Sequence, residues 1–308
     1  MKLYLPEGKG LAASRPQLTP AGLRRAMERG TVLEAVAVRC DEDHALWLEL
    51  GESVGKIPRE EAALGVREGT VRETAILSRV GRPVCFCVTG LRQTPEGLLA
   101  LCSRRLAQQP AQQRLLDGLR PGDILPAVVA GLASFGAFCD LGRGVLGLLP
   151  NAGIAVSRTE HAAERFVLGQ EIVVAARRVE AGRITLSHRE LLGTWMDNAV
   201  RFAPGQIVPG VVRSVMPYGV FVELRPNLSG LCPPREELRP GDRVSVRIGA
   251  IRPECRKIKL SIVAKLPPAA QPPAAQPPHY DYVRRSGHMD FWQYAPPCGE
   301  KPPILTCF

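Results

Sequence analysis

An internal repeat constrains the fold of this chain more than any other sequence feature. Residues Gly122–Val129 match residues Gly205–Val212, and an aromatic–glycine pair follows at the same spacing in each copy, Phe135-Gly136 and Tyr218-Gly219. Both copies then continue through a Gly-Leu-x-Pro motif, a glycine-led strand and a closing strand that opens on a basic residue, in one order. Self-similarity of this kind indicates that one structural unit is used at least twice.

Each copy is divided by glycines into five short runs in which apolar and other residues alternate, which is the pattern of β-strands. A five-stranded sheet exposes no edge if it closes into a barrel, and that is the architecture of the OB fold. We therefore predict a mainly β protein built from five-stranded OB-fold barrels.

A fainter copy lies upstream. Gly30–Val36 is similar to the start of the other copies, and Gly55–Glu61 is similar to the segment around Pro234–Glu237 in the last one. This copy lacks the aromatic–glycine pair and has Leu98 where the others open their last strand with a basic residue. It predicts a third, degenerate barrel, so the expected architecture is three tandem barrels with short helical connectors.

The two ends of the chain differ from the repeats. Thr19-Pro20 before a short amphipathic run, with Gly30 after it, is typical of a capped helix. From Leu266 the chain becomes a proline-rich spacer. The expected segments are 1–29, helical lead-in; 30–106, degenerate barrel; 107–117, helical linker; 118–189, barrel; 190–202, helical linker; 203–264, barrel; 265–279, proline-rich spacer; 280–308, aromatic tail.

The tail carries five aromatic residues, Tyr280, Tyr282, Phe291, Trp292 and Tyr294. So short a segment cannot bury five rings by itself. We expect residues 280–308 to dock on a protein partner. The alternative is that these rings fold back into a groove between the barrels.

Charge points to a polyanionic partner. The chain has a net charge of +10, and residues 201–265 hold 12 basic and 5 acidic side chains, a net of +7. Phosphates neutralised by such a surface release counterions, which favours binding to nucleic acid. No apolar run is long enough to span a bilayer, and no signal peptide is evident, so we expect a cytoplasmic protein without membrane contact.

The motifs of residues 118–264 resemble the S1 RNA-binding domain, and residues 30–106 resemble it more faintly. The stretch Glu190–Trp195 is similar to multi-repeat ribosomal S1 homologues of Gram-positive, especially clostridial, bacteria. This resemblance implies binding of single-stranded RNA, in particular mRNA, and a role in translation at the small ribosomal subunit. The family often has a histidine after Gly-Leu-Leu, where this chain has Pro58, Pro150 and Pro233. One polar RNA contact per domain is therefore absent.

The resemblance also implies which side chains meet RNA. In the family both aromatics of the repeated motif lie on the RNA-binding face, and a basic residue opens the last strand. The residues at these positions, with Arg247 on the outward side of the preceding strand, are Phe135, Phe138, Arg183, Tyr218, Phe221, Arg247 and Lys257. Aromatic rings can stack on any exposed base. Packing in the barrel core is the alternative for the rings, and a solvated surface charge is the alternative for the cations.

Trp47 aligns with the second aromatic of the motif only, so stacking and core packing are both open for it. No nucleophile–base arrangement, phosphate-binding loop or zinc spacing is evident, so we expect no enzyme, cofactor or metal site. Two alternatives to the translational role stay open. One is an accessory RNA-binding factor in RNA decay or processing, and the other is a protein–protein scaffold on the ribosome.

Overall fold

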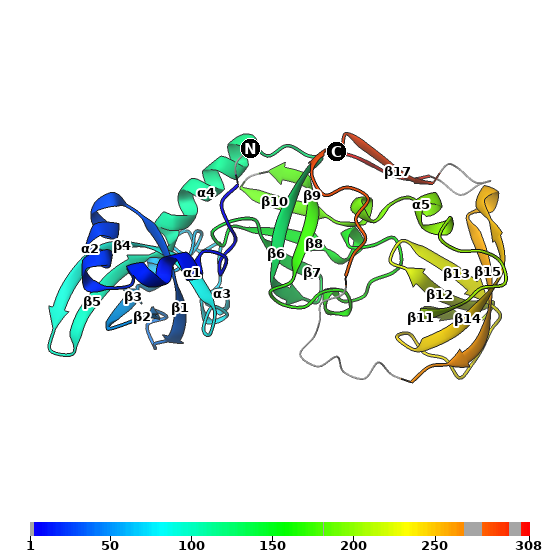
Figure 1. Ribbon diagram of the computed structural model, residues 1–308, viewed down its shortest axis with the longest axis horizontal. Coiled ribbons are helices and arrows are strands. Elements are labelled where there is room, and N and C mark those ends of the chain that lie inside the picture. Colours follow the sequence, from blue (N-terminus) through cyan, green and yellow to red (C-terminus); the bar gives the residue numbers. More distant parts are fainter. Residues whose placement is uncertain (1–2, 181, 268–278, 296–302) are drawn as a thin grey trace. The chain divides into compact units, whose positions relative to one another are not determined.

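The computed structural model describes residues 3–180, 182–267, 279–295 and 303–308. The described chain is mainly β-strand, as the alternating pattern predicts (Figure 1). By their internal contacts the residues divide into two compact units. Met1–Leu119 with Asp140–Leu146 form one unit, and Arg120–Cys139 with Gly147–Phe308 form the other. The finer division into eight segments stays a prediction.

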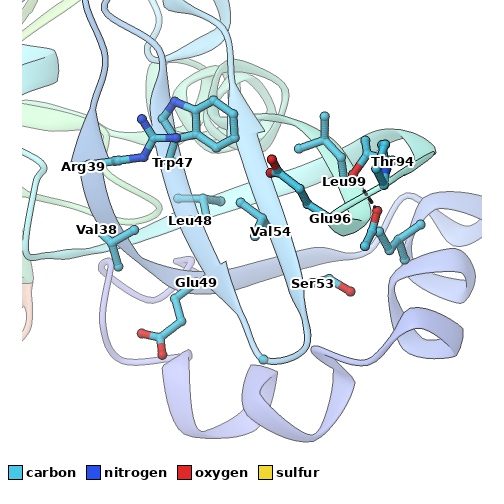
Figure 2. A pocket seen from close by; sticks show the side chains of 14 residues that line it. Val38, Arg39, Trp47, Leu48, Glu49, Ser53, Val54, Thr94, Glu96 and Leu99 are labelled. Carbon is cyan, nitrogen blue, oxygen red and sulfur yellow. Dashed lines mark hydrogen bonds between the residues drawn. The ribbon is translucent and has the colours of Figure 1, made fainter.

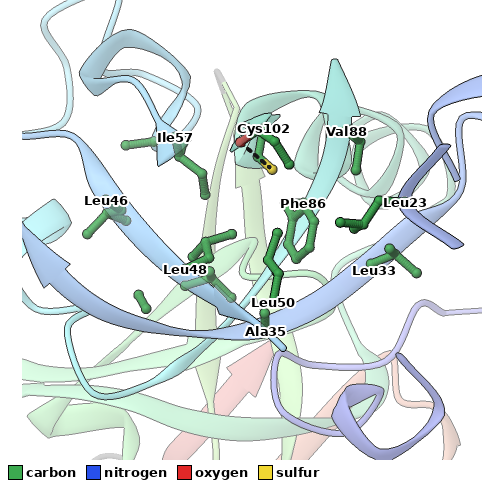
Figure 3. Packing of buried hydrophobic residues seen from close by; sticks show 14 of the residues in the cluster. Leu23, Leu33, Ala35, Leu46, Leu48, Leu50, Ile57, Phe86, Val88 and Cys102 are labelled. Atoms are coloured by element: carbon green, nitrogen blue, oxygen red, sulfur yellow. Dashed lines mark hydrogen bonds between the residues drawn. The ribbon is translucent and has the colours of Figure 1, made fainter. Parts of the chain in front are cut away.

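The first five strands close into a barrel in the order β1-β2-β3-β5-β4. They are β1 (Val32–Cys40), β2 (Leu46–Leu50), β3 (Ser53–Ile57), β4 (Pro83–Thr94) and β5 (Gly97–Ser103). The third strand pairs in parallel with the fifth, and the first pairs with the fourth. Leu33, Leu46, Leu48 and Phe86 fill the interior (Figure 3).

The second unit repeats this strand order twice. Its first sheet contains β6 (Asp123–Ala133), β7 (Gly136–Asp140), β8 (Leu146–Pro150), β9 (Glu171–Glu180) and β10 (Arg183–Ser187). It closes through the pairing of β6 with β9 and carries a sixth strand, β16 (Gly287–His288), on β6. Its second sheet is a closed barrel of β11 (Ile207–Met216), β12 (Gly219–Arg225), β13 (Leu228–Cys232), β14 (Arg243–Arg252) and β15 (Lys257–Lys265).

Short helices occupy the connections. The α-helices are α1 (Leu11–Ser14), α2 (Pro20–Arg29), α3 (Glu73–Leu77), α4 (Arg104–Gly118) and α5 (Trp195–Ala199). The 3-10 turns are η1 (Arg15–Gln17), η2 (Arg59–Glu61), η3 (Asn151–Gly153), η4 (Ala162–Glu164), η5 (Arg189–Leu192) and η6 (Pro253–Cys255). None of the helices in the described part of the chain combines the length and the apolar character that crossing a membrane requires.

The helix caps follow the sequence signals, with one difference. Thr19 Oγ1 accepts a hydrogen bond from the Gly22 amide at 3.1 Å, and Gly30 ends α2 with a φ of 61°. The helix expected from residue 107 begins instead at Arg104, because Ser103 caps it, and Pro110 lies inside it. The linker expected over 190–202 is η5 followed by α5, with a break at Gly193 between them.

The C-terminal tail buries three of its five aromatic rings and leaves Phe291 exposed. Tyr280, Trp292 and Tyr294 are buried against the second unit, and β17 (Phe291–Ala295) pairs with β18 (Ile304–Cys307). The tail (red in Figure 1) therefore follows the second interpretation, in which its rings fold back onto the barrels. The expectation of a docked protein partner is not supported. Residues 268–278 of the expected spacer lie outside the described residues.

His188 is fully buried where the tail meets the β6–β10 sheet. Its Nδ1 lies 2.8 Å from the Ile154 carbonyl oxygen and its Nε2 lies 3.1 Å from the Tyr282 hydroxyl, while the Tyr280 ring packs edge-on at 4.8 Å. A neutral ring with its proton on Nδ1 donates to Ile154 and accepts from Tyr282. Burial lowers the pKa of His188 to about 4, because a buried imidazolium would lose its hydration.

We expect the second unit to lose stability on mild acidification because of His188. The folded-state pKa lies below the unfolded value of 6.5, so only the unfolded state gains this proton as the pH falls from 7 to 5. The stability from neutral His188 is thus present above about pH 6.5 and declines toward pH 4. The loss by pH 5 should be about 2 kcal/mol, and His188→Gln should abolish it.

The measurement is urea unfolding at pH 7 and pH 5, followed by tryptophan fluorescence. A Trp47→Phe background leaves Trp195 and Trp292 as the only tryptophans, and both are buried in the second unit. His161→Gln, at an exposed histidine, is the control and should keep the full pH dependence. The same pH dependence in all three proteins would contradict the assignment.

Candidate nucleic-acid interface

The repeated aromatic–glycine pair forms the turn between the first two strands of each barrel in the second unit. Gly219 starts β12 with a φ of 154°, and a Cβ atom there would lie 2.5 Å from the Cys232 carbonyl oxygen. A Cβ at Gly136 would lie 2.4 Å from the Leu149 carbonyl oxygen. Only glycine permits so close an approach of two strands. The preceding aromatic residue is left at the tip of the turn.

These aromatic residues are exposed and are supported from one side by a second ring. Tyr218 is 65% exposed and lies edge-on to Phe221, with ring centroids 6.2 Å apart. Phe135 is 56% exposed and lies edge-on to Phe138 at 5.9 Å. Phe138 and Phe221 are half-buried, and the core of the β11–β15 barrel contains the neighbours of Phe221 but not Phe221 itself. The geometry therefore answers the question of core packing: all four rings lie on the outer face.

Strand pairing extends this face across the β11–β15 barrel. Phe221 pairs with Leu231 on β13, and Leu231 pairs in parallel with Lys259 on β15. Residues paired across strands point to the same side of a sheet, so an aromatic, an apolar and a cationic side chain form one row. Sequence reasoning missed Lys259. The alternation of Lys257-Ile258-Lys259-Leu260, in which both isoleucine and leucine are buried, was the signal that could have found it.

The predicted cations are exposed, but they are not all in this row. Lys257 lies two residues before Lys259 on the same face of β15 and pairs with Arg252. Arg247 pairs with Ile207 and Ser261, in a different row on β14. None of the cations Arg183, Arg247, Lys257 and Lys259 has an ion-pair partner among the residues that the structure describes. Each can therefore approach a phosphate without breaking a salt bridge.

The corresponding face of the β6–β10 sheet is less basic. Thr185 on β10 pairs in parallel with Leu148 on β8, so a hydroxyl stands where the last barrel has Lys259. Arg183 opens β10 and pairs with Glu180 across the strand. This sheet thus keeps the aromatic pair and one predicted cation.

In the first barrel, Trp47 also lies on the outer face, outside the core formed by its neighbours Leu46 and Leu48. The Arg39 guanidinium lies 4.1 Å from the Trp47 ring centroid and the Lys56 ammonium lies 5.0 Å from it. The indole N–H donates to Asp41 at 2.8 Å, and this hydrogen bond lowers the pKa of Asp41. Trp47 is therefore held in one orientation between charged groups.

Trp47 borders an open groove with a volume of about 650 Å³ (Figure 2). Val54 and Leu99 supply apolar surface, while Glu49 and Glu96 bring carboxylates to the same groove. These carboxylates offset the positive charge of Arg39, which also lines the groove, and so weaken its attraction for phosphate. This face therefore differs in charge from that of the β11–β15 barrel, although both carry an aromatic ring at the same place in the strand order.

No cluster of metal-ligating side chains is found within the described residues. Asp140 and Glu223 occupy matched positions in the two repeats, but both are buried and engaged. Asp140 accepts hydrogen bonds from the Gly142 and Gly144 amides, so it fixes a turn. Glu223 forms an ion pair with Arg165. Neither carboxylate is placed for acid–base chemistry.

Comparisons with known proteins agree with this geometry. The family described as the S1 RNA binding domain matches residues 119–189 and 201–263. The small ribosomal subunit protein bS1 of Staphylococcus aureus (strain COL) is 32% identical over 191 residues, covering 56% of this chain and 49% of that protein. The bS1 protein of Leuconostoc lactis is 34% identical over 179 residues, covering 54% and 41%.

Among solved structures, GSP13 from Bacillus subtilis is 27% identical and covers 29% of this chain and 62% of its own, with a TM-score of 0.22. The sequence matches define the class: the second unit contains two S1 RNA-binding domains in tandem. Over these two domains the chain is similar to the bS1 ribosomal proteins. It spans about half the length of the curated relatives that it matches.

The exposed rings generate a direct test. We expect the double substitution Phe135→Ala, Tyr218→Ala to weaken binding of single-stranded RNA by about 2–6 kcal/mol, because two stacked bases are lost at about 1–3 kcal/mol each. Circular dichroism should show an unchanged fold, since both rings are exposed. Leu168→Ala with Val200→Ala, which removes two exposed apolar side chains elsewhere in the unit, is the control. Unchanged RNA affinity in the aromatic variant would remove these rings from the interface.

Proposed function

We propose that this protein binds single-stranded RNA without catalysis, through the outer faces of its two S1 domains. The observation that carries the proposal is the pair of edge-on aromatic rings at each β-turn, whose outer member is more than half exposed. A ring braced in this way offers one flat face to a base and loses little freedom when the base stacks on it. The RNA-binding residues are Phe135, Phe138, Arg183, Tyr218, Phe221, Arg247 and Lys257, to which Lys259 is added.

The charge distribution supports a ranking of the barrels by their contribution to RNA affinity. The β11–β15 barrel holds the basic surplus of residues 201–265 and unpaired cations beside its aromatic row. The first barrel offers Trp47 with carboxylates nearby, so it contributes less to RNA affinity. Stacking and phosphate contacts carry little base specificity, so binding is tolerant of sequence.

We further propose that the RNA is mRNA and that the protein acts in translation at the small ribosomal subunit, in the bacterial cytoplasm. The similarity to bS1 proteins over both S1 domains supports this setting. Crosslinking of bound RNA in cells, followed by sequencing, tests it. Enrichment of mRNA together with co-sedimentation on small subunits is the expected result. Enrichment of decay intermediates without ribosome association would overturn the translational role.

The unpaired cations predict a change in salt dependence. We expect Arg247→Gln, Lys257→Gln, Lys259→Gln to reduce the slope of log K against log salt concentration by about 2, since each phosphate contact to a single strand contributes about 0.7. The matched control is Arg24→Gln, Arg25→Gln, Arg29→Gln on α2, which removes the same charge from exposed positions in the first unit. Equal slopes for the two triple variants would mean that net charge alone, and not this face, governs binding.

A further inference from the structure

The C-terminal tail is anchored to the first of the two S1 domains by side-chain and backbone contacts. The Tyr280 hydroxyl donates to the Arg165 carbonyl oxygen at 2.6 Å, and its ring packs against Phe166 and His188. The Tyr282 hydroxyl accepts from the Val173 amide at 3.2 Å. Further along, β16 pairs with the start of β6. The tail is therefore part of this domain's sheet and of its packing.

The same tail also completes the core of the second S1 domain. Trp292 and Tyr294 belong to the buried cluster that contains Val220 and Val222 of β12. The Tyr294 hydroxyl donates to the Asn227 carbonyl oxygen. Asp281 accepts from Arg225 of β12 at 2.8 Å and from Arg201 at 3.2 Å. A segment of fewer than thirty residues thus packs on both domains.

The two S1 domains also contact each other directly, next to the residues that hold the tail. Arg165 donates both terminal guanidinium nitrogens to Glu223 at 2.6 Å, and both side chains are buried. Burial would raise the pKa of Glu223, but the hydrogen bonds and charges of Arg165 and Arg213 lower it. Glu223 would keep Arg213 if Arg165 were lost, but loss of Glu223 would leave the buried Arg165 guanidinium without its counter-charge. This pair therefore resists separation of the domains.

Asn227 adds a second fixed point at the same junction. Its side chain is fully buried, donates to the Arg189 and Gly193 carbonyl oxygens at 2.7 and 2.8 Å, and accepts from the Val156 amide at 2.9 Å. Every hydrogen-bonding position of this amide is thereby used apart from one acceptor lone pair. The tail contacts the same residue through Tyr294, so tail and junction form one network.

None of these contacts involves Phe135 or Tyr218, which remain exposed. We infer that the C-terminal tail is an intramolecular strap that holds the two S1 domains as one rigid body, so that a single RNA strand is bound jointly by both aromatic pairs. This inference rests on the proposed RNA binding. Tyr280, Trp292 and Tyr294 are then positioning residues, which set RNA affinity without touching RNA.

A strap of this kind makes the RNA affinity depend on the length of the RNA strand. When two sites are fixed on one body, the second binding event is intramolecular and takes place at a high effective concentration. A strand that reaches only one site gains nothing from the strap. Loosening the strap should therefore weaken binding of a long strand and leave binding of a short one unchanged.

The test uses the full chain and oligouridylates of two lengths, about 6 nucleotides for one OB fold and about 30 for two. The strap variant is Tyr280→Ala, Trp292→Ala. We expect its affinity for the long strand to fall about ten-fold or more, toward that of independent sites, while its affinity for the short strand stays within about two-fold. Phe291→Ala, in the same tail but exposed, should leave both affinities unchanged.

Nuclear magnetic relaxation gives a second readout. The rotational correlation times of the two S1 domains should be equal in the unaltered protein and should differ in the strap variant. Long-strand affinity that does not change, with equal correlation times, would overturn the inference. If the unaltered protein binds neither strand, the proposed function itself fails.

A general loss of folding gives a different result, because short-strand binding would fall as well. In that case the Tyr280→Phe, Tyr294→Phe variant distinguishes the loss of the strap from the loss of the fold. It keeps both rings and removes only the two hydroxyls that donate to Arg165 and Asn227. A selective loss of long-strand affinity in this variant supports the strap. Wild-type affinities for both lengths would overturn it.

Discussion

Hydrogen bonding between the first and fourth strands closes each sheet, and the two faces of every strand in it depend on this closure. The pairings β1–β4, β6–β9 and β11–β14 close the sheets, so each strand has one face toward a core and one toward solvent. Once Val220 and Val222 are inside, Phe221 has to point out. Register across the closed sheet then brings Phe221, Leu231 and Lys259 together from three strands.

The packing of the backbone alone explains the position of the aromatic–glycine pair, without reference to a ligand. Gly219 allows β12 to approach β13 closely, and a tight turn then carries Tyr218 away from the core. The first barrel has the same strand order without a glycine in the turn between its first two strands. There, the Asp41 carboxylate accepts from the Ala45 amide at 2.8 Å and supports a longer turn, with His44 at a φ of 60°. One ring, Trp47, remains on that face because the glycine-dependent turn is absent.

The sequence predicted those features of the fold that are determined by a few neighbouring residues. Strand alternation and glycine spacing predicted the mainly β class and the outward position of the aromatic motif, because both are set within a few residues. Local alternation is enough to place Lys259 on the outside, but its position beside Leu231 depends on the parallel register between β13 and β15. Arg247 falls in another row beyond a bulge in β14. The tail has no periodicity of its own. Its place in the fold comes from partners such as Phe166, His188 and Asn227, which only the tertiary structure brings near.

The sixth strand of the first S1 domain covers a short open edge of β6. On one side, Ile124 of β6 pairs with Ala175 of β9, and on the other it meets Gly287 of β16. Without β16 this part of β6 would display free amide and carbonyl groups, which are a template for strand addition by a neighbouring molecule. Because β16 fills this position from within the same chain, the edge of β6 at Asp123 and Ile124 is not open to strand addition.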